Sequence, residues 1–236
     1  MKLFCCYTPA HEVLFRDYFK PTIPNSFELQ TAIIELEGAG DFLSPEFIRC
    51  ICRKIELIME SVRANSGGAI IWSDIDIQFF DITPEALLSQ LGDHDIAFQP
   101  EGPRVKHVNT GFFICRCNDR VLRFFEKVRD GLQASPGMNE QYIINLLLED
   151  AALDLSWTYL PFSYYARTHG WPPPRQLSLY HANATPGKGG VARKIQQFKE
   201  LAFVRRFGFP AVVLTSIKYV PKRLWRVLSE RLARAS

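Results

Sequence analysis

Hydrophobic and polar positions along the chain follow two patterns: short apolar runs, and longer stretches in which apolar residues recur every three or four positions. The short runs are bounded by Gly, Pro or acidic residues and predict strands, whereas the periodic stretches predict helices. The expected strands cover residues 2–8, 27–36, 69–72, 95–99, 111–116, 157–165 and 177–181. The expected helices cover residues 11–20, 45–66, 119–132 and 139–150, with Ser44 as the N-cap of the second. This alternation predicts an α/β fold, with helices on both faces of a mostly parallel sheet.

The length of 236 residues fits one such domain with an appendage. Hydrophobic residues make up 47% and charged residues 22% of the chain, which excludes a disordered or fibrous protein. The formal net charge is +3, but 11 of the 28 Lys and Arg residues fall within residues 191–236. We therefore expect one domain over residues 1–200 and a basic tail over residues 201–236. No apolar run approaches the roughly 18 residues that cross a bilayer and the start of the chain lacks a signal-peptide pattern, so we expect a cytoplasmic protein.

The basic tail has an amphipathic pattern. Leu224, Leu228 and Leu232 recur every fourth residue after Pro221 and are flanked by Arg and Lys. A helix with one apolar stripe and basic flanks is typical of segments in the interface of an anionic membrane, and equally of helices that pack on a domain. The first alternative predicts a peripheral protein on the inner face of the membrane. Because the rest of the chain is acidic and no nucleic-acid-binding motif accompanies the tail, nucleic acid is not an expected partner.

Two carboxylates follow the expected strand at residues 69–72. Asp74 and Asp76 would lie at the carboxyl edge of the sheet, where ligands bind in open α/β folds. Neighbouring carboxylates repel each other unless a cation neutralises them, so a hard divalent metal ion is their natural companion. The structural alternative is that one Asp caps a turn and the other is solvated.

Further polar groups fall at the ends of other expected elements. Asn109, Thr110 and Gly111 lead into one strand, and Glu140 and Gln141 open a helix after Asn139. His181 ends the last expected strand, and Lys188 follows it within the glycine loop Gly187–Gly190. Each has a structural alternative, since Asn139 can cap its helix and a single His is often a satisfied core residue.

In their order and spacing, these residues together resemble the metal-dependent glycosyltransferases of the GT-A fold, in particular the nucleotide-diphospho-sugar transferase family. The resemblance covers residues 1–198 and implies a Rossmann-like domain. It implies that Asp74, Asp76 and His181 bind Mn²⁺ or Mg²⁺ against the diphosphate of a sugar nucleotide, and that Lys188 contacts the same phosphates.

The resemblance also implies roles around the two sugars. Asn109 and Gly111 would line the donor-sugar and acceptor site, and Glu140 and Gln141 would face the sugar near the reacting carbon. Candidates for nucleoside contacts are Tyr7, Thr8 and Lys54.

The implied function is transfer of a hexosyl or pentosyl group from a nucleotide-diphosphate donor, a UDP-sugar above all, to a glycan or lipid-linked acceptor. We expect retention of configuration, because no isolated base stands out and the leaving phosphate can accept the acceptor's proton. One alternative is a sugar-nucleotide-binding protein without catalysis. Another is a phosphohydrolase of the haloacid-dehalogenase type, which Gln78 and Phe79 disfavour because that family's motif continues differently after its second Asp.

Overall fold

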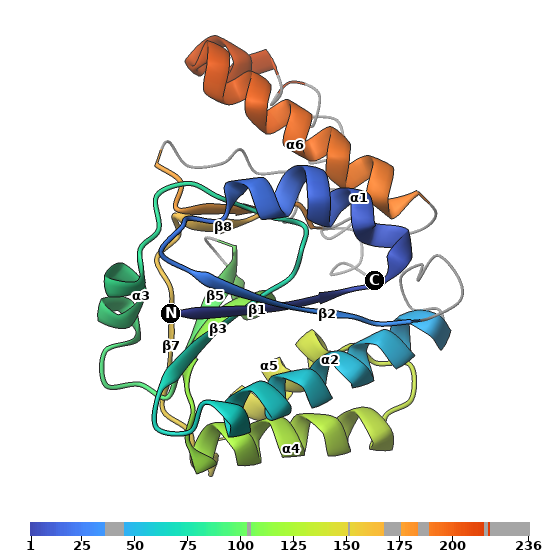
Figure 1. Cartoon of the computed structure of the whole chain (residues 1–236), viewed down its shortest axis with the longest axis vertical. Helices are drawn as coiled ribbons and strands as arrows, with labels where there is room; N and C mark the ends of the chain where they lie inside the picture. The colour runs from blue at the N-terminus through green and yellow to red at the C-terminus, as the bar shows by residue number, and fades with distance from the viewer. Residues whose placement is uncertain are drawn as a thin grey trace, which may run out of the picture.

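A six-stranded sheet runs through the centre of the protein in the computed structural model (Figure 1). The structure describes residues 1–35, 45–102, 105–150, 152–167, 176–183, 189–214 and 217. The sheet has the order β2-β1-β3-β6-β5-β7. Its strands are β1 (Lys2–Tyr7), β2 (Glu28–Ile33), β3 (Ala69–Ser73), β5 (Ile96–Gly102), β6 (Val105–Arg116) and β7 (Trp157–Tyr159).

One strand of this sheet, β6, runs against the others. β1 is parallel to β2 and β3, and β5 is parallel to β7, whereas β6 is antiparallel to both β3 and β5. The predicted mostly parallel sheet is thus confirmed. Because β6 is reversed, its middle part meets the carboxyl ends of β3 and β5, where Ser73 pairs with Phe112 and Gln99 pairs with Asn109.

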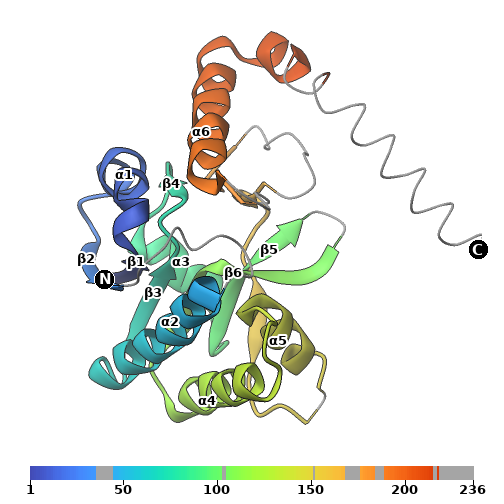
Figure 2. The same ribbon diagram turned by 90° about the vertical axis from the view of Figure 1, so that its right-hand side faces the viewer.

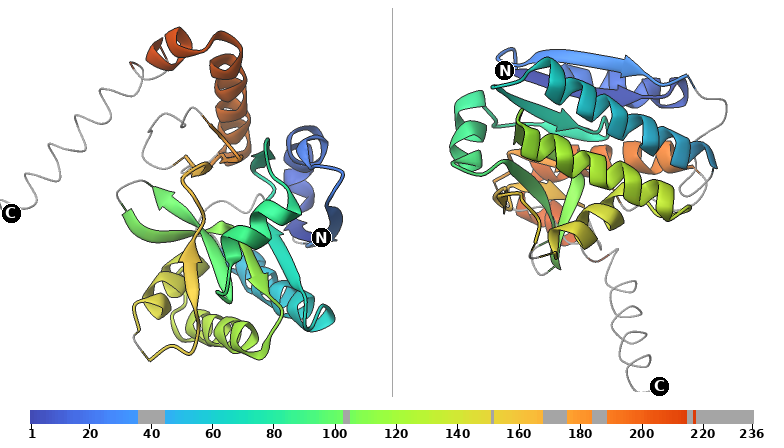
Figure 3. Two further views of the ribbon diagram at one scale, coloured as in Figure 1. Left: turned by 90° about the vertical axis from the view of Figure 1, so that its left-hand side faces the viewer. Right: turned by 90° about the horizontal axis from the view of Figure 1, so that it is seen from below.

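Three helices cover one face of the sheet and lie side by side (Figure 3). They are α2 (Pro45–Ala64), α4 (Asp119–Ala134) and α5 (Glu140–Leu148). The buried residues of α2, such as Ile55 and Ile58, pack in one cluster with Trp72 and Phe113 of the sheet and Phe124 of α4. The periodicity that predicted these helices is therefore the periodicity of their buried faces.

The opposite face is covered by helical turns and a second sheet. The turns are η1 (Pro9–His11), α1 (Glu12–Leu14), η2 (Phe15–Phe19) and η3 (Lys20–Thr22). The small sheet has the order β4-β9-β8, with β4 (Ile77–Phe79), β8 (Tyr164–Ala166) and β9 (Leu179–His181). The helix α6 (Gly190–Phe207) lies on this side, and α3 (Pro84–Leu91) lies at one edge. Phe112 of the central sheet packs in one core cluster with Phe79, Tyr180 and Phe198.

The structure corrects three expectations about elements. Residues 157–165 form two strands in different sheets, because the chain turns at Pro161, which has no N–H to donate to a ladder. The strand β4 and helix α3 were not predicted, although Thr83 and Pro84 form an ordinary helix start, with Thr83 Oγ1 accepting from Ala86 N. The helix α6 was not predicted either, and Gly190, expected within a loop, is its first residue.

At its C-terminal end, α6 extends away from the sheets (Figure 2). Residue 200, the expected domain boundary, lies within this helix, so the division of the chain stays a prediction. The amphipathic helix expected after Pro221 lies outside the described residues, as does Ser44. Among the described helices, none is both long enough and apolar enough to cross a membrane.

Candidate metal centre

Asp74 and Asp76 occupy the connection between the two sheets. The chain leaves the central sheet at the end of β3 and enters the small sheet at β4, so both carboxylates lie in the three-residue crossover between them. The backbone of the crossover is fixed on both sides, since Asp74 N donates to Gly111 O at 2.6 Å and Ala182 N donates to Asp76 O at 2.8 Å.

The pairing of the small sheet brings His181 to the same place. β4 and β9 are antiparallel, and His181 pairs with Ile77, the residue next to Asp76. One ligand atom from each of Asp74, Asp76 and His181 lies within 4.8 Å of the others. Two carboxylate oxygens and one imidazole nitrogen form a donor set that suits a hard to borderline cation such as Mn²⁺ or Mg²⁺. The three residues expected to bind a metal ion are therefore brought together.

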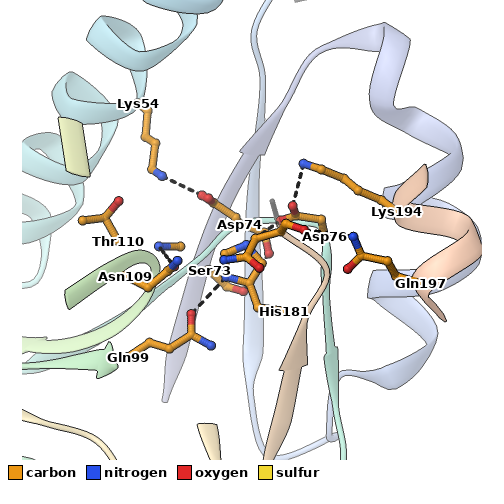
Figure 4. A network of polar contacts seen from close by, with 12 residues as sticks. Lys54, Ser73, Asp74, Asp76, Gln99, Asn109, Thr110, His181, Lys194 and Gln197 are labelled. Carbon is orange, nitrogen blue, oxygen red and sulfur yellow. Dashed lines mark hydrogen bonds and ion pairs between the residues drawn. The ribbon is translucent and has the colours of Figure 1, made fainter. Parts of the chain in front are cut away.

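A buried lysine from α2 neutralises the first carboxylate. Lys54 Nζ lies 2.7 Å from Asp74 Oδ1 (Figure 4). It also lies 3.0 Å from Oε1 of Glu140, the first residue of α5. Burial disfavours the Lys54 ammonium, but Asp74 and Glu140 outweigh it and raise the pKa of Lys54. For Asp74, burial dominates and raises the pKa of the carboxyl, with Lys54 opposing. Lys54, which was expected to contact the nucleoside, thus lies between the carboxylates of Asp74 and Glu140.

A second lysine, Lys194 of α6, neutralises the other carboxylate. Its Nζ lies 2.6 Å from Asp76 Oδ2. Burial would disfavour the ionised form of Asp76, but Lys194 and His181 outweigh this effect and lower its pKa. Sequence reasoning singled out Lys188, which lies outside the described residues, and missed Lys194. The sequence signal that could have identified Lys194 is its position four residues after Gly190, close to the glycine loop that already contained the candidate Lys188.

The remaining expected residues lie around this group. Asn109 Nδ2 donates to Glu101 Oε2 at 2.6 Å, and its Oδ1 accepts from Gly111 N at 3.0 Å. Burial raises the pKa of Glu101, with hydrogen bonds from Asn109 and Gln141 opposing. The hydrogen bond to Glu101 brings Gln141, in the first turn of α5, to the β5–β6 side of the site. Asn139 caps that helix, accepting from Tyr142 N at 2.8 Å.

Tyr7 and Thr8 lie at the carboxyl end of β1, the strand beside β3. The Tyr7 ring stacks on Phe15 with ring centroids 4.5 Å apart. Thr8 Oγ1 lies 2.8 Å from His11 Nδ1. Burial and then the positive charge of Lys194 lower the pKa of His11, with Asp76 opposing.

Comparison with solved structures defines the class of fold. A glycosyltransferase involved in the glycosylation of the major capsid of PBCV-1 is similar with a TM-score of 0.61 at 12% identity, over 84% of this chain and 98% of that one. The galactosyltransferase LgtC, solved with donor and acceptor sugar analogs, is similar with a TM-score of 0.53 at 14% identity, over 86% of this chain and 95% of that one. The fold is that of the GT-A glycosyltransferases.

Sequence comparison gives the family. The chain belongs to the nucleotide-diphospho-sugar transferase family, whose profile matches residues 20–197. An uncharacterized protein of Arabidopsis thaliana, At1g28695, is 30% identical over 116 residues, which cover 49% of this chain. The matched part makes up about a third, 34%, of that relative's length. The resemblance inferred from the sequence motifs is confirmed.

Proposed function

We propose that this chain is a metal-dependent glycosyltransferase that moves a hexosyl or pentosyl group from a nucleotide-diphosphate donor to an acceptor hydroxyl. The observation that supports this most is the convergence of Asp74, Asp76 and His181 at the junction of the two sheets, within a chain of this family. In the reaction the bond between the sugar carbon and the diphosphate oxygen breaks, and a bond to the acceptor oxygen forms. The acceptor's proton passes to the leaving phosphate, with retention of configuration.

The metal centre and its lysines would act on the leaving group. When bound by Asp74, Asp76 and His181, Mn²⁺ or Mg²⁺ supplies a Lewis acid that stabilises the diphosphate as charge builds on it. Lys194 lies 2.6 Å from Asp76, and its ammonium supplies a second positive charge for the phosphates. The family resemblance implies the same role for Lys188. These preorganised charges stabilise the transition state more than the ground state.

Other residues would orient the donor and the acceptor. Lys54 holds Asp74 and Glu140 in one group, so the first metal ligand and the start of α5 keep a fixed distance. Gln141 and Asn109 face the sugar, with Gly111 beside them. The nucleoside, uridine in our proposal, would contact Tyr7 and Thr8.

Two buried side-chain oxygens, one two residues after β9 and one on α6, would suit a ligand rich in hydroxyl groups. Asn183 Oδ1 and Gln197 Oε1 are buried and accept no hydrogen bond from the described part of the chain. Gln197 lies on the same side as Asp76 and Lys194 (Figure 4). Since a buried acceptor without a donor costs about 1–3 kcal/mol, hydroxyl groups of a bound sugar nucleotide would relieve that cost.

The proposal is tested by incubating the protein with Mn²⁺ and a panel of UDP-, GDP- and CMP-sugars, with and without glycan acceptors, and measuring nucleotide release. We expect release that stops with EDTA and in Asp76→Ala, and that persists in Asp93→Ala, which changes an exposed Asp outside the site. Metal-dependent binding of a donor without turnover would favour the non-catalytic alternative. Phosphate release from small phosphoesters would favour the phosphohydrolase.

We further propose that the enzyme is peripheral on the cytoplasmic face of a membrane and uses a lipid-linked acceptor. Large apolar side chains are exposed on the end of α6 and just after it: Phe203, Phe207, Phe209, Leu214 and Ile217. Arg205 and Arg206 lie among them, and the basic segment 218–236 follows. Apolar residues with basic neighbours suit an anionic lipid surface.

This membrane proposal is tested by sedimentation with anionic and neutral vesicles, for the full chain and for a truncation after Gly208. Binding of the full chain alone to anionic vesicles would support it. Failure of both proteins to bind would contradict it, and insolubility of the truncated protein would favour a tail that packs on the domain.

A further inference from the structure

The imidazole of His181 lies directly against the backbone of β6 at Gly111. A Cβ atom at position 111 would lie 2.9 Å from Nδ1 and 3.0 Å from Nε2 of that ring. Real Cβ atoms do not approach a ring this closely, so an alanine would displace the imidazole. Because Gly111 has no side chain, the imidazole of His181 can lie against the backbone of β6.

A buried glutamine holds the other side of the ring. Gln99, which follows the apolar residues Ile96–Phe98 in β5, is 0% exposed. Its Nε2 donates to the backbone carbonyl of Tyr164 at 3.2 Å, and its Oε1 lies 3.0 Å from His181 Nδ1. Gln99 thereby links β5 of the central sheet to β8 and β9 of the small sheet.

The two contacts of Gln99 determine which nitrogen of His181 has the proton. A backbone carbonyl only accepts hydrogen bonds, so the amide nitrogen of Gln99 must face Tyr164 and the amide oxygen must face Nδ1. An amide oxygen also only accepts, so Nδ1 must be the donor. With the Nδ1 proton held there, Nε2 is the nitrogen left to bind a cation, and Nε2 is the atom that lies 3.3 Å from Asp76 Oδ1.

We infer that Gln99 and Gly111 are positioning residues for the metal ion. Gln99 holds the proton on Nδ1 of His181, and Gly111 makes room for the ring, so that Nε2 faces Asp76 and would be free to bind the metal ion with Asp74 and Asp76. This inference rests on the proposed metal-dependent function. It assigns Gln99 a role that no motif of the sequence indicated, and it assigns Gly111 a role toward a metal ligand in addition to the proposed sugar site.

The test measures Mn²⁺ affinity of the protein without donor, by isothermal titration or by electron paramagnetic resonance of free Mn²⁺. Gln99→Leu should weaken Mn²⁺ binding about 10-fold to 100-fold, as removal of a hydrogen-bond partner of a ligating His does. Gln99→Glu keeps an acceptor for Nδ1 but loses the donor to the Tyr164 carbonyl, so it should weaken Mn²⁺ binding less than Gln99→Leu does. Gln90→Leu, which changes an exposed Gln of α3, should leave it unchanged.

A double-mutant cycle separates an effect through His181 from a general loss of structure. In a His181→Ala background, Gln99→Leu should have no further effect on Mn²⁺ affinity, because the side chain it positions is gone. Gly111→Ala provides a second route if Gln99→Leu does not fold, and it should weaken binding only when His181 is present. Equal Mn²⁺ affinity of wild type, Gln99→Leu and Gly111→Ala, or equal losses with and without His181, would overturn the inference.

The metal titrations and the transfer assay test the two proposals independently, so one proposal can be contradicted while the other stands. If wild type binds Mn²⁺ and the variants follow this pattern while no sugar nucleotide turns over, the positioning roles stand and the transferase proposal is wrong. If transfer is metal-dependent but the variants bind Mn²⁺ as wild type does, the transferase proposal stands and the positioning roles are wrong.

Discussion

Replacing Lys54 by methionine should destabilise the protein, because the lysine is the positive charge between two buried or half-buried carboxylates. Its side chain is 8% exposed, that of Glu140 is 11% exposed and that of Asp74 is 33% exposed. Removing one partner of a buried ion pair costs about 3–5 kcal/mol, and the partial exposure of Asp74 favours the lower end, about 3 kcal/mol. For a chain of this length, that corresponds to a Tm lower by about 6–12 °C.

Guanidinium chloride unfolding at pH 7 measures this loss. Lys127→Met, which removes an exposed lysine of α4, should change the free energy of unfolding by less than about 0.5 kcal/mol. Adding Glu140→Gln to Lys54→Met should recover part of the loss, since it removes one of the uncompensated charges. If Lys54→Met unfolds within about 0.5 kcal/mol of wild type, the two ion pairs contribute no net stability and the reasoning is wrong.

Two further predictions concern Lys194 and Asp95. Lys194→Met should lower kcat for sugar transfer by about 100-fold, as loss of one preorganised charge does, while Mn²⁺ binds more tightly without donor because the ammonium no longer competes for Asp76. Lys199→Met, on the exposed side of the same helix, is the control, and an unchanged kcat in Lys194→Met would remove Lys194 from the mechanism. Asp95 is buried, and although burial opposes its ionisation, hydrogen bonds from Ser156, Arg120 and Asn118 lower its pKa below the ordinary 3.8. Its stabilising effect is therefore present above pH 3.8 and lost as the pH falls through the lower folded-state pKa. Asp95→Asn should be about 1–3 kcal/mol less stable at pH 7, and in urea unfolding the difference from wild type should shrink as the pH falls below 3.8. A pH-independent difference, or an equal loss in the exposed control Asp93→Asn, would contradict this explanation.

The fold was predictable wherever local pattern and tertiary packing agree. The apolar period of α2 and the Gly-bounded run of β3 are local signals that the packed structure retains. The reversal of β6 was not visible, because strand direction depends on the hairpin with β5 and not on the composition of either strand. The short strand β4 is defined by its pairing with β9, about 100 residues later in the chain.

The same distinction applies to the site. The pair Asp74 and Asp76 stands out because two acids follow a buried strand, and His181 because it ends a later one. Gln99 and Lys194 are ordinary polar residues in the sequence. Their importance comes from the register between the two sheets and from the packing of α6, which a single sequence does not display.

The long helix α6 joins two chemically different ends of the molecule. Its 18 residues extend about 27 Å, with Lys194 near the first end and Phe207 at the last. Between them, Glu200 is held through an ion pair of 2.9 Å by Arg167, the residue that follows β8. Phe198 and Leu201 of the same helix are buried in the core cluster, so this packing and the Glu200 ion pair together fix where Lys194 lies relative to Asp76. One rigid helix thus carries both the lysine beside the candidate metal ligands and the exposed aromatic end that we propose contacts a membrane.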